Sequence, residues 1–272
     1  MIGWSSADAP AKINLALVVG PLRGDGRHEL VTVLTKVALA DTISVRRAAA
    51  TRVDGFAADT LVRGALDALS AESGGTVSFE ARIEKRVPVA AGLGGGSSDA
   101  ATALAIANDL LDEPLSAAHL ERLAARLGAD VPFFLREEPC LGTGDGTTLE
   151  PARLPTDYAV VLALADGAEK ESTGEVYASF DARAGHLGFD ERRRALLDAL
   201  AGVEAASDLA SLPPNDLASS PLAAELESLG ALRADVTGAG PVVYGLFGRM
   251  DDAEHAAAAL RERGRTWVTT PG

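Results

Sequence analysis

The 272-residue sequence has a single cysteine, Cys140, which excludes an internal disulfide bond. One cysteine fits a reducing compartment, so the sequence predicts a cytoplasmic protein. Charged residues interrupt every apolar run well before 18 positions, which predicts that no helix spans a membrane. Residues 1–10 lack the basic and apolar regions of a secretion signal, so we expect no signal peptide.

Basic residues are also scarce. The chain carries 25 Lys and Arg against 39 Asp and Glu, a formal net charge of −14. This balance argues against nucleic acid or an anionic membrane as a partner. A hydrophobic content of 47% is ordinary for a globular enzyme. If so acidic a chain binds an anion, local donors must outweigh its overall charge.

Glycine and serine are concentrated in one stretch between two regular segments. The alternating segment 77–84 predicts a half-buried strand, and the largely apolar segment 100–111 predicts a buried helix. We expect Ser97 or Ser98 to cap that helix and Asp99 to lie in its first turn. The stretch consists of Pro88, Val89, Ala90, Ala91, Gly92, Leu93, Gly94, Gly95, Gly96, Ser97 and Ser98.

A glycine-rich turn before a helix favours anion binding for physical reasons. Glycine allows positive φ and close approach of the backbone, and the free amides of the first helical turn point at an incoming anion. No Lys-Ser or Lys-Thr pair follows the glycines, so the stretch is not a Walker A loop, and its spacing does not fit a dinucleotide fingerprint. The alternative is a tight junction that needs glycine only for packing. We predict a phosphate-binding loop.

The N-terminal region predicts strands. Apolar side chains alternate over residues 9–20, a pattern that predicts a strand with one face on the core. Lys12 and Asn14 share the opposite face, where a solvated strand end is the simplest interpretation of the lysine. A turn at residues 23–26 precedes His28, and further strands are expected to about residue 39 and over 41–46.

The middle of the chain predicts helices over 59–70 and 117–127, with Ser116 as a cap and Gly128 as the end of the second. Asp130 follows directly and precedes an apolar Val-Pro-Phe-Phe-Leu run. Such a carboxylate either caps a neighbouring element or lines a cleft. Residues 142–146 predict a hairpin turn.

The sequence pattern changes near residue 151, and Pro151 and Pro155 mark the domain junction that we expect there. Beyond it the sequence predicts an α+β arrangement with an antiparallel sheet. The expected elements are strands at 158–165 and 242–247, a polar loop at 166–173, and helices around 176–180, 190–200, 222–229 and 252–263.

Several motifs in this order resemble the GHMP kinases, a family of small-molecule kinases with a glycine-rich phosphate loop. Within that family the sequence is most similar to the kinases of the non-mevalonate isoprenoid pathway that act on 4-diphosphocytidyl-2-C-methyl-D-erythritol. The motifs are AKIN at 11–14, DGRHEL at 25–30, GLGGGSSDAA at 92–101, LGADVPFFL at 127–135, GTGDGTTLEP at 142–151, ND at 215–216 and TGAGPVVYGLF at 237–247.

The resemblance implies a two-domain α+β fold. Residues 1–150 would form an ATP-binding mixed α/β domain of the ribosomal-protein-S5-domain-2-like type, and residues 151–272 a ferredoxin-like C-terminal domain. It implies transfer of phosphate from ATP, with Mg²⁺, to the 2-hydroxyl of the cytidine-diphosphate-linked methylerythritol. We expect a monomer or weak homodimer with no metal-ligating residues of its own.

The resemblance also implies roles for particular residues. Asp130 would be the catalytic carboxylate, Lys12 its partner at the substrate hydroxyl, and residues 88–98 the ATP phosphate loop. The substrate would be bound by Asn14, Arg27, His28, Thr173, Thr237 and Gly238, with His28 against the cytosine.

Three positions depart from the family pattern. Arg27 stands where the family usually has a tyrosine expected to stack on cytosine, and a guanidinium can also stack. Asp59 and Ala239 replace a frequent asparagine and serine. These changes weaken the substrate assignment and leave the kinase assignment intact.

Two alternative functions stay open from sequence. Another GHMP kinase, acting on homoserine, a mevalonate-type substrate or a sugar, is the nearest, and the DGRHEL and LGADVPFFL stretches count against it. The other is a non-catalytic nucleotide-binding regulator of the same fold, against which the presence of both Lys12 and Asp130 argues.

Overall fold

The computed structural model describes residues 3–59, 61–168 and 172–272. Residue 60 of the expected helix 59–70 and residues 169–171 of the expected polar loop lie outside this part. The chain forms two compact units. Unit 1 comprises Met1–Ala11, Leu39–Val89 and Gly94–Glu137, and unit 2 comprises Lys12–Ala38, Ala90–Leu93 and Glu138–Gly272.

Two long paired strands, β1 (Ser5–Leu22) and β2 (His28–Ala48), supply residues to both units. The expected alternation in β1 holds, because Ile13 and Leu15 are fully buried. The expectation of one core face is wrong, since Lys12 and Asn14 on the other face are buried too. The expected break near residue 40 is also wrong, because no glycine or proline interrupts β2 there.

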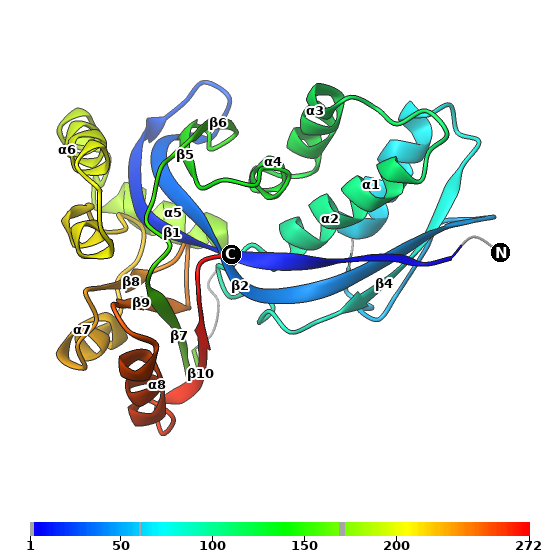
Figure 1. Ribbon diagram of the computed structural model, residues 1–272. Helices are drawn as coiled ribbons and strands as arrows, with labels where there is room; N and C mark the ends of the chain where they lie inside the picture. Colours follow the sequence, from blue (N-terminus) through cyan, green and yellow to red (C-terminus); the bar gives the residue numbers. More distant parts are fainter. Residues whose placement is uncertain (1–2, 60, 169–171) are drawn as a thin grey trace. The chain divides into compact units, whose positions relative to one another are not determined.

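In unit 1, β4 (Ser78–Glu84) pairs antiparallel with β2 and parallel with the short β3 (Arg52–Asp54). The expected alternation in β4 is confirmed by its buried Phe79, Ala81 and Ile83. Helices α1 (Leu61–Glu72) and α2 (Gly95–Asp109) pack on β4, and Figure 1 shows both on the same face of this part of the sheet. Helices α3 (Ala117–Leu127) and α4 (Val131–Phe134) pack against them.

Helix α2 begins earlier than predicted, at Gly95 instead of residue 100. Its N-cap is Gly94, whose φ of 69° lies in the left-handed region, and Ser97 and Ser98 lie inside the helix, so they cap nothing. Asp99 is consequently in the second turn, and its expected role at the helix dipole is wrong. The expected bounds of α3 are confirmed, with Gly128 at its C-cap, although the Ser116 side chain makes no capping hydrogen bond.

Unit 2 contains the expected hairpin, formed by β5 (Cys140–Gly144) and β6 (Thr148–Pro151), with β5 paired to β2. It also contains an antiparallel sheet in the order β10-β7-β9-β8, which confirms the predicted antiparallel arrangement. Its strands are β7 (Ala159–Ala165), β8 (Arg233–Val236), β9 (Val243–Phe247) and β10 (Gly264–Thr269). The sequence did not predict β8 or β10.

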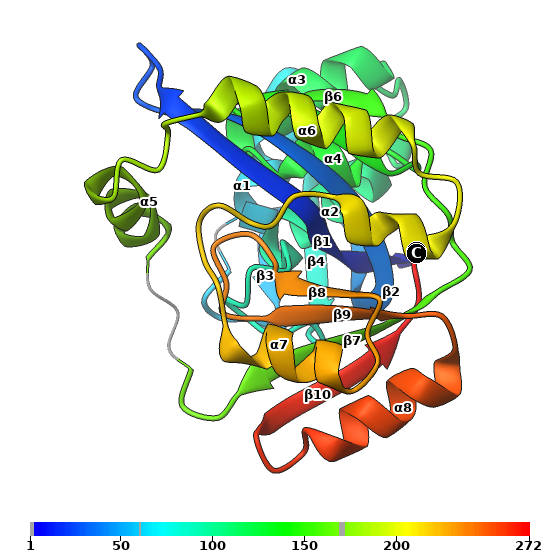
Figure 2. The ribbon, with the colours of Figure 1, turned by 90° about the vertical axis from the view of Figure 1, so that its left-hand side faces the viewer.

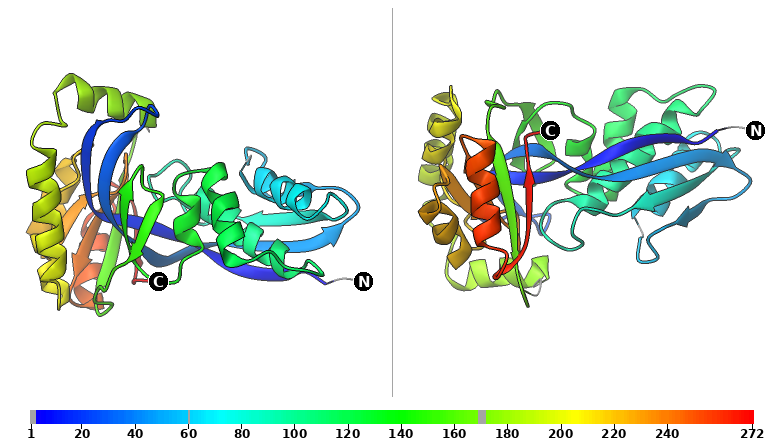
Figure 3. Two further views of the ribbon diagram at one scale, coloured as in Figure 1. Left: turned by 90° about the horizontal axis from the view of Figure 1, so that it is seen from above. Right: turned by 60° about the horizontal axis from the view of Figure 1, so that its bottom comes forward.

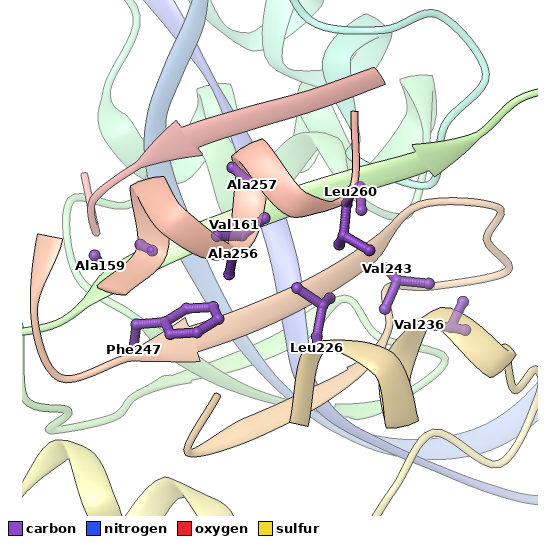
Figure 4. Packing of buried hydrophobic residues seen from close by; sticks show 11 residues of the cluster. Ala159, Val161, Leu226, Val236, Val243, Phe247, Ala256, Ala257 and Leu260 are labelled. Carbon is purple, nitrogen blue, oxygen red and sulfur yellow. The ribbon is translucent and has the colours of Figure 1, made fainter. Parts of the chain in front are cut away.

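Helices α7 (Pro221–Ser228) and α8 (Met250–Ala259) cover one face of this sheet (Figures 2 and 3). Helix α8 ends four residues before the predicted end. The core between them is apolar, and Figure 4 shows Phe247 and Leu226 within it. Truncating a fully buried ring such as Phe247 to alanine typically costs about 3–5 kcal/mol. Further cluster members include Ala159, Val161, Val236, Val243, Ala256, Ala257 and Leu260.

Three further helical segments complete unit 2: α5 (Thr173–Ala182), α6 (Phe189–Ala201) and the 3₁₀ turn η1 (Ala206–Ser211). Helix α5 starts with a capping box between Ser172 and Glu175. Among the described helices, none is long and apolar enough to cross a membrane.

Candidate active site

Strand β1 carries a buried polar pair at its centre. Lys12 Nζ donates to Asn14 Oδ1 at 2.6 Å, and Asn14 Nδ2 donates to Thr32 Oγ1 at 2.8 Å. Lys12 is 4% exposed and Asn14 6%. Because Thr32 Oγ1 donates onward to the Ala16 carbonyl, the chain of hydrogen bonds fixes which way the Asn14 amide faces.

A turn after β8 closes over this pair. Thr237 Oγ1 accepts from the Asn14 backbone N–H at 3.0 Å. A Cβ built on Gly238 would lie 3.4 Å from Lys12 Nζ, so only a small residue leaves this space open. Asn215 anchors the turn by donating to the carbonyls of Val236 and Gly238. Unit 2 therefore brings together Lys12, Asn14, Thr237 and Gly238, which the sequence analysis assigned to one site.

The loop expected to bind phosphate, Pro88–Ser98 (the phosphate loop below), has a conformation that its glycines allow. Gly92 and Gly94 have φ values of 82° and 69°, and Ala90 has 59°. A Cβ on Gly92 would lie 2.5 Å from the Thr237 carbonyl oxygen, so glycine is required there. The Leu93 carbonyl accepts the backbone N–H of Lys12 at 2.9 Å, which links the loop to the polar pair on β1.

The end of the loop forms the first turn of α2. Ser98 Oγ is fully buried and makes no hydrogen bond within the described part of the chain. Buried hydroxyl groups normally have a partner, so an orphaned one beside a helix N-terminus fits an anion-binding site. A Cβ on Gly95 would lie 3.1 Å from Val87 Cγ1, so this glycine also serves close packing. The loop thus combines features that suit an anion with glycines that allow close packing.

Charged side chains are buried next to the loop in unit 1. Lys85 Nζ donates to Asp41 Oδ2 and, at 2.8 Å, to Asp99 Oδ2. Burial raises the pKa of Asp99 to about 7, although the Lys85 ammonium opposes the shift. Burial would lower the pKa of Lys85, but its two carboxylate partners raise it.

Asp130 stands at the N-cap of α4, between Gly128 and the buried residues Val131 and Phe133. Its carboxylate makes no capping hydrogen bond to α4 and its side chain is partly exposed. The apolar run that follows it fixes the backbone at this point by burial, which suits a side chain that must be held in one place.

His28 lies in an aromatic cluster of unit 2. Its Nδ1 lies 2.8 Å from the Gly20 carbonyl, which can only accept, so Nδ1 is the donor. The ring stacks on Tyr177, with centroids 5.0 Å apart, and meets Phe180 edge-on. Asp181 Oδ2 lies 3.4 Å from the other ring nitrogen. Flat aromatic surface beside a fixed imidazole can accept a heterocyclic base.

Arg27 and Thr173 are the outermost of the expected substrate residues. The Arg27 guanidinium pairs with Asp145. Burial would raise the pKa of Asp145, but hydrogen bonds from Thr147 and Arg27 lower it. Thr173 is exposed and is the first residue of α5, where the sequence had placed it in a loop.

Sequence reasoning gave no role to Thr32, Tyr177 or Lys85. Tyr177 had been placed only on an expected helix, although it is one of three tyrosines in the chain. Lys85 is one of four lysines and follows the strand before the loop, a signal that could have marked it.

Comparison with known proteins identifies two family models along the chain. "GHMP kinases N terminal domain" matches residues 60–138, and "GHMP kinases C terminal" matches residues 189–266.

No group of three or more His, Cys, Asp or Glu side chains in the described ranges could hold a metal ion.

Two of the curated relatives illustrate the similarity. The 4-diphosphocytidyl-2-C-methyl-D-erythritol kinase of Gloeobacter violaceus is 38% identical, over 93% of this chain and 88% of its own length. The protein of that name from Rhodococcus jostii is also 38% identical, over 94% and 88%. A crystal structure of 4-(cytidine 5'-diphospho)-2C-methyl-D-erythritol kinase matches with a TM-score of 0.80 and 33% identity, over 98% of this chain and 99% of that one. The predicted α+β fold class is confirmed.

Proposed function

Because this chain belongs to the 4-diphosphocytidyl-2-C-methyl-D-erythritol kinases of the GHMP family, we propose that it phosphorylates the 2-hydroxyl of that substrate in non-mevalonate isoprenoid biosynthesis. The chain is an ATP-dependent small-molecule kinase. The observation that supports the substrate assignment is the 38% identity, over 93% of the chain, to a kinase of that name.

Phosphoryl transfer depends on alignment and charge stabilisation more than on covalent help from the protein. We assign Asp130 as the base that accepts the proton of the attacking hydroxyl, and Lys12 as the ammonium that orients this oxygen. The hydrogen bond from Lys12 to Asn14, whose backbone N–H donates to Thr237 Oγ1, supports this assignment because it restricts the position of the ammonium.

The phosphate loop supplies donors to the triphosphate of ATP. The left-handed glycines, the start of α2 and the orphaned Ser98 hydroxyl all fit a polyanion. Local backbone donors explain how a chain with net charge −14 binds one. Magnesium would be held by phosphate oxygens and water, with one or two carboxylates, as is usual for this ion.

We assign the cytosine to the aromatic cluster of His28, with Asn14, Thr173, Thr237 and Gly238 towards the rest of the substrate. Tyr177, which packs on the His28 ring, supports this assignment because a base can stack on an aromatic side chain next to the imidazole. Arg27 lies next to His28, and its guanidinium could add a contact to the base or a phosphate. We further expect a cytoplasmic enzyme, monomeric or weakly dimeric, that does not bind nucleic acid.

The test is ADP release with a panel of acceptors: the diphosphocytidyl methylerythritol, its uridine analogue, homoserine, mevalonate and galactose. We expect release with the cytidine substrate at least about a hundredfold above the others, and its loss in Lys12→Ala. Activity on homoserine, mevalonate or galactose alone would show a different GHMP kinase. ATP binding with no release on any acceptor would show a non-catalytic regulator.

A further inference from the structure

The buried charged cluster of Lys85, Asp41 and Asp99 has no part in the chemistry above. Asp41 is 0% exposed, Asp99 is 1% exposed and the Lys85 side chain 16%. Buried charges are retained at a cost in desolvation, which their mutual pairing must offset. A cluster so close to the phosphate loop calls for a role there.

The cluster joins the two ends of the phosphate loop. Asp41 Oδ1 accepts the backbone N–H of Arg86 and, at 2.8 Å, that of Val87, immediately before the loop begins. Asp99 follows Ser98, the last residue of the loop. Lys85 bonds both carboxylates, and a Cβ on Gly95 would lie 3.4 Å from its Nζ. The ammonium therefore lies directly against the start of α2.

The charges of the cluster do not balance. Two carboxylates and one ammonium leave a net charge of −1 when all are ionised. Asp99 Oδ1 is buried and has no hydrogen-bond partner within the described residues, and the charged groups that act on Asp99 are Lys85 and Asp41. An anion that arrives at the loop meets this excess of negative charge, which a proton would remove.

We propose that Lys85 is a positioning residue that holds the two ends of the phosphate loop together, and that Asp99 takes up a proton from solvent when the triphosphate binds. This rests on the proposed function, which makes residues 88–98 the ATP site. With the proton on Asp99, the cluster becomes neutral beside the bound anion. Burial raises the pKa of Asp99 to about 7, so the proton is available near neutral pH.

Calorimetric titration tests the proton uptake. The magnesium complex of a non-hydrolysable ATP analogue is titrated into the wild type and Asp99→Asn, in HEPES and in Tris, at pH 7 and pH 8. The dependence of the enthalpy on buffer gives the protons taken up. The matched control is Asp109→Asn, an exposed carboxylate at the other end of α2.

The wild type should take up more protons than Asp99→Asn, by at most about 0.5 per site at pH 7 and about 0.9 at pH 8, because a carboxyl with a pKa near 7 is half protonated at pH 7. Asp109→Asn should behave like the wild type. Equal uptake by the wild type and Asp99→Asn would overturn the proposal. Failure of the wild type to bind the analogue would instead overturn the proposed function.

Steady-state kinetics test the positioning role. Lys85→Met should raise the KM for ATP at least about tenfold and leave the KM for the cytidine substrate within about twofold, and Lys85→Arg should recover most of the loss. Arg52→Met removes the same charge from an exposed site of unit 1 and should change neither constant. An unchanged KM for ATP in a folded Lys85→Met would contradict the role. If Lys85→Met does not fold, Lys85→Arg is measured instead. An equal rise of the KM for ATP and the KM for the cytidine substrate in that variant would contradict the role.

Discussion

Lys12 and Asn14 show how the fold prepares single side chains for chemistry. Both are almost completely buried, where an unpaired polar group would cost about 1–3 kcal/mol. Thr32 and Thr237 satisfy the N–H groups of Asn14, and Asn14 Oδ1 accepts a hydrogen bond from the Lys12 ammonium. Hydrogen bonds to each other, to Thr32 and to Thr237 therefore hold these two side chains in place.

Asp130→Asn tests the proposed base. The amide keeps the shape of the side chain and cannot accept the proton, so kcat should fall by about 10²–10⁴, with both KM values changing little. The control is Asp67→Asn, an exposed carboxylate on α1 in the same unit. A purified Asp130→Asn enzyme that turned over within about threefold of the wild type would remove Asp130 from this role.

Arg27 is tested by two substitutions. A cation over a ring contributes about 0.5–2 kcal/mol, so Arg27→Tyr should change the substrate KM by no more than about tenfold. Arg27→Ala should raise that KM selectively, with the KM for ATP unaffected. Tyr177→Ala, which removes the ring stacked on His28, should raise it further. If Arg27→Ala left the substrate KM unchanged while His28→Ala raised it, Arg27 would be only the partner of Asp145.

At the scale of the element, the phosphate loop depends on glycine where a Cβ has no room. Gly92→Ala would place a methyl group 2.5 Å from the Thr237 carbonyl, at a φ of 82°. The left-handed conformation alone costs alanine about 1–2 kcal/mol. We expect at least a tenfold rise in the KM for ATP. Gly96→Ala is the matched control, since its methyl group would make only an ordinary contact with Leu61. Equal effects from the two would contradict the account of the loop.

The buried Asp99 in helix α2 predicts how the stability of the protein depends on pH. The folded protein raises the pKa of Asp99 from 3.8 to about 7, so between these values it binds more protons than the unfolded chain. Stability from this group therefore falls as pH rises from about 4 to 7. Asp99→Asn removes the dependence, so its Tm relative to the wild type should increase over that range. Asp109→Asn should show no such trend, and a constant difference for Asp99→Asn would refute the shift.

Local pattern predicted most of the regular elements, although not β8 or β10, and missed the contacts that depend on distant partners. The alternation of apolar residues predicted β4, and the flanking Ser116 and Gly128 predicted the bounds of α3. Both patterns extend over only a few neighbouring residues. The glycine run hid the start of α2, since a helix N-terminus that packs tightly needs glycine as much as a loop does. The partners of Lys85 lie 44 and 14 residues away, so spacing in the sequence could not assign them.

At the scale of the whole molecule, family membership settles the class of reaction. The domain boundary at residue 150 stays a prediction, because the two family models match residues 60–138 and 189–266 and leave it between them. The strands β1 and β2 contribute to both compact units, so a contiguous division of the sequence would not reproduce those units. The site assignments were made by resemblance, and Lys12, Asn14, Thr237 and Gly238 are the ones that unit 2 brings together.

The most direct test is the identity of the product. The enzyme is incubated with Mg-ATP and diphosphocytidyl methylerythritol labelled with ¹³C at carbon 2, and the product is examined by ³¹P and ¹³C NMR. The account predicts one ADP per product molecule and a new phosphomonoester signal coupled to the labelled carbon. A phosphate on any other hydroxyl would contradict the account. So would an unchanged substrate when the protein is folded and binds ATP.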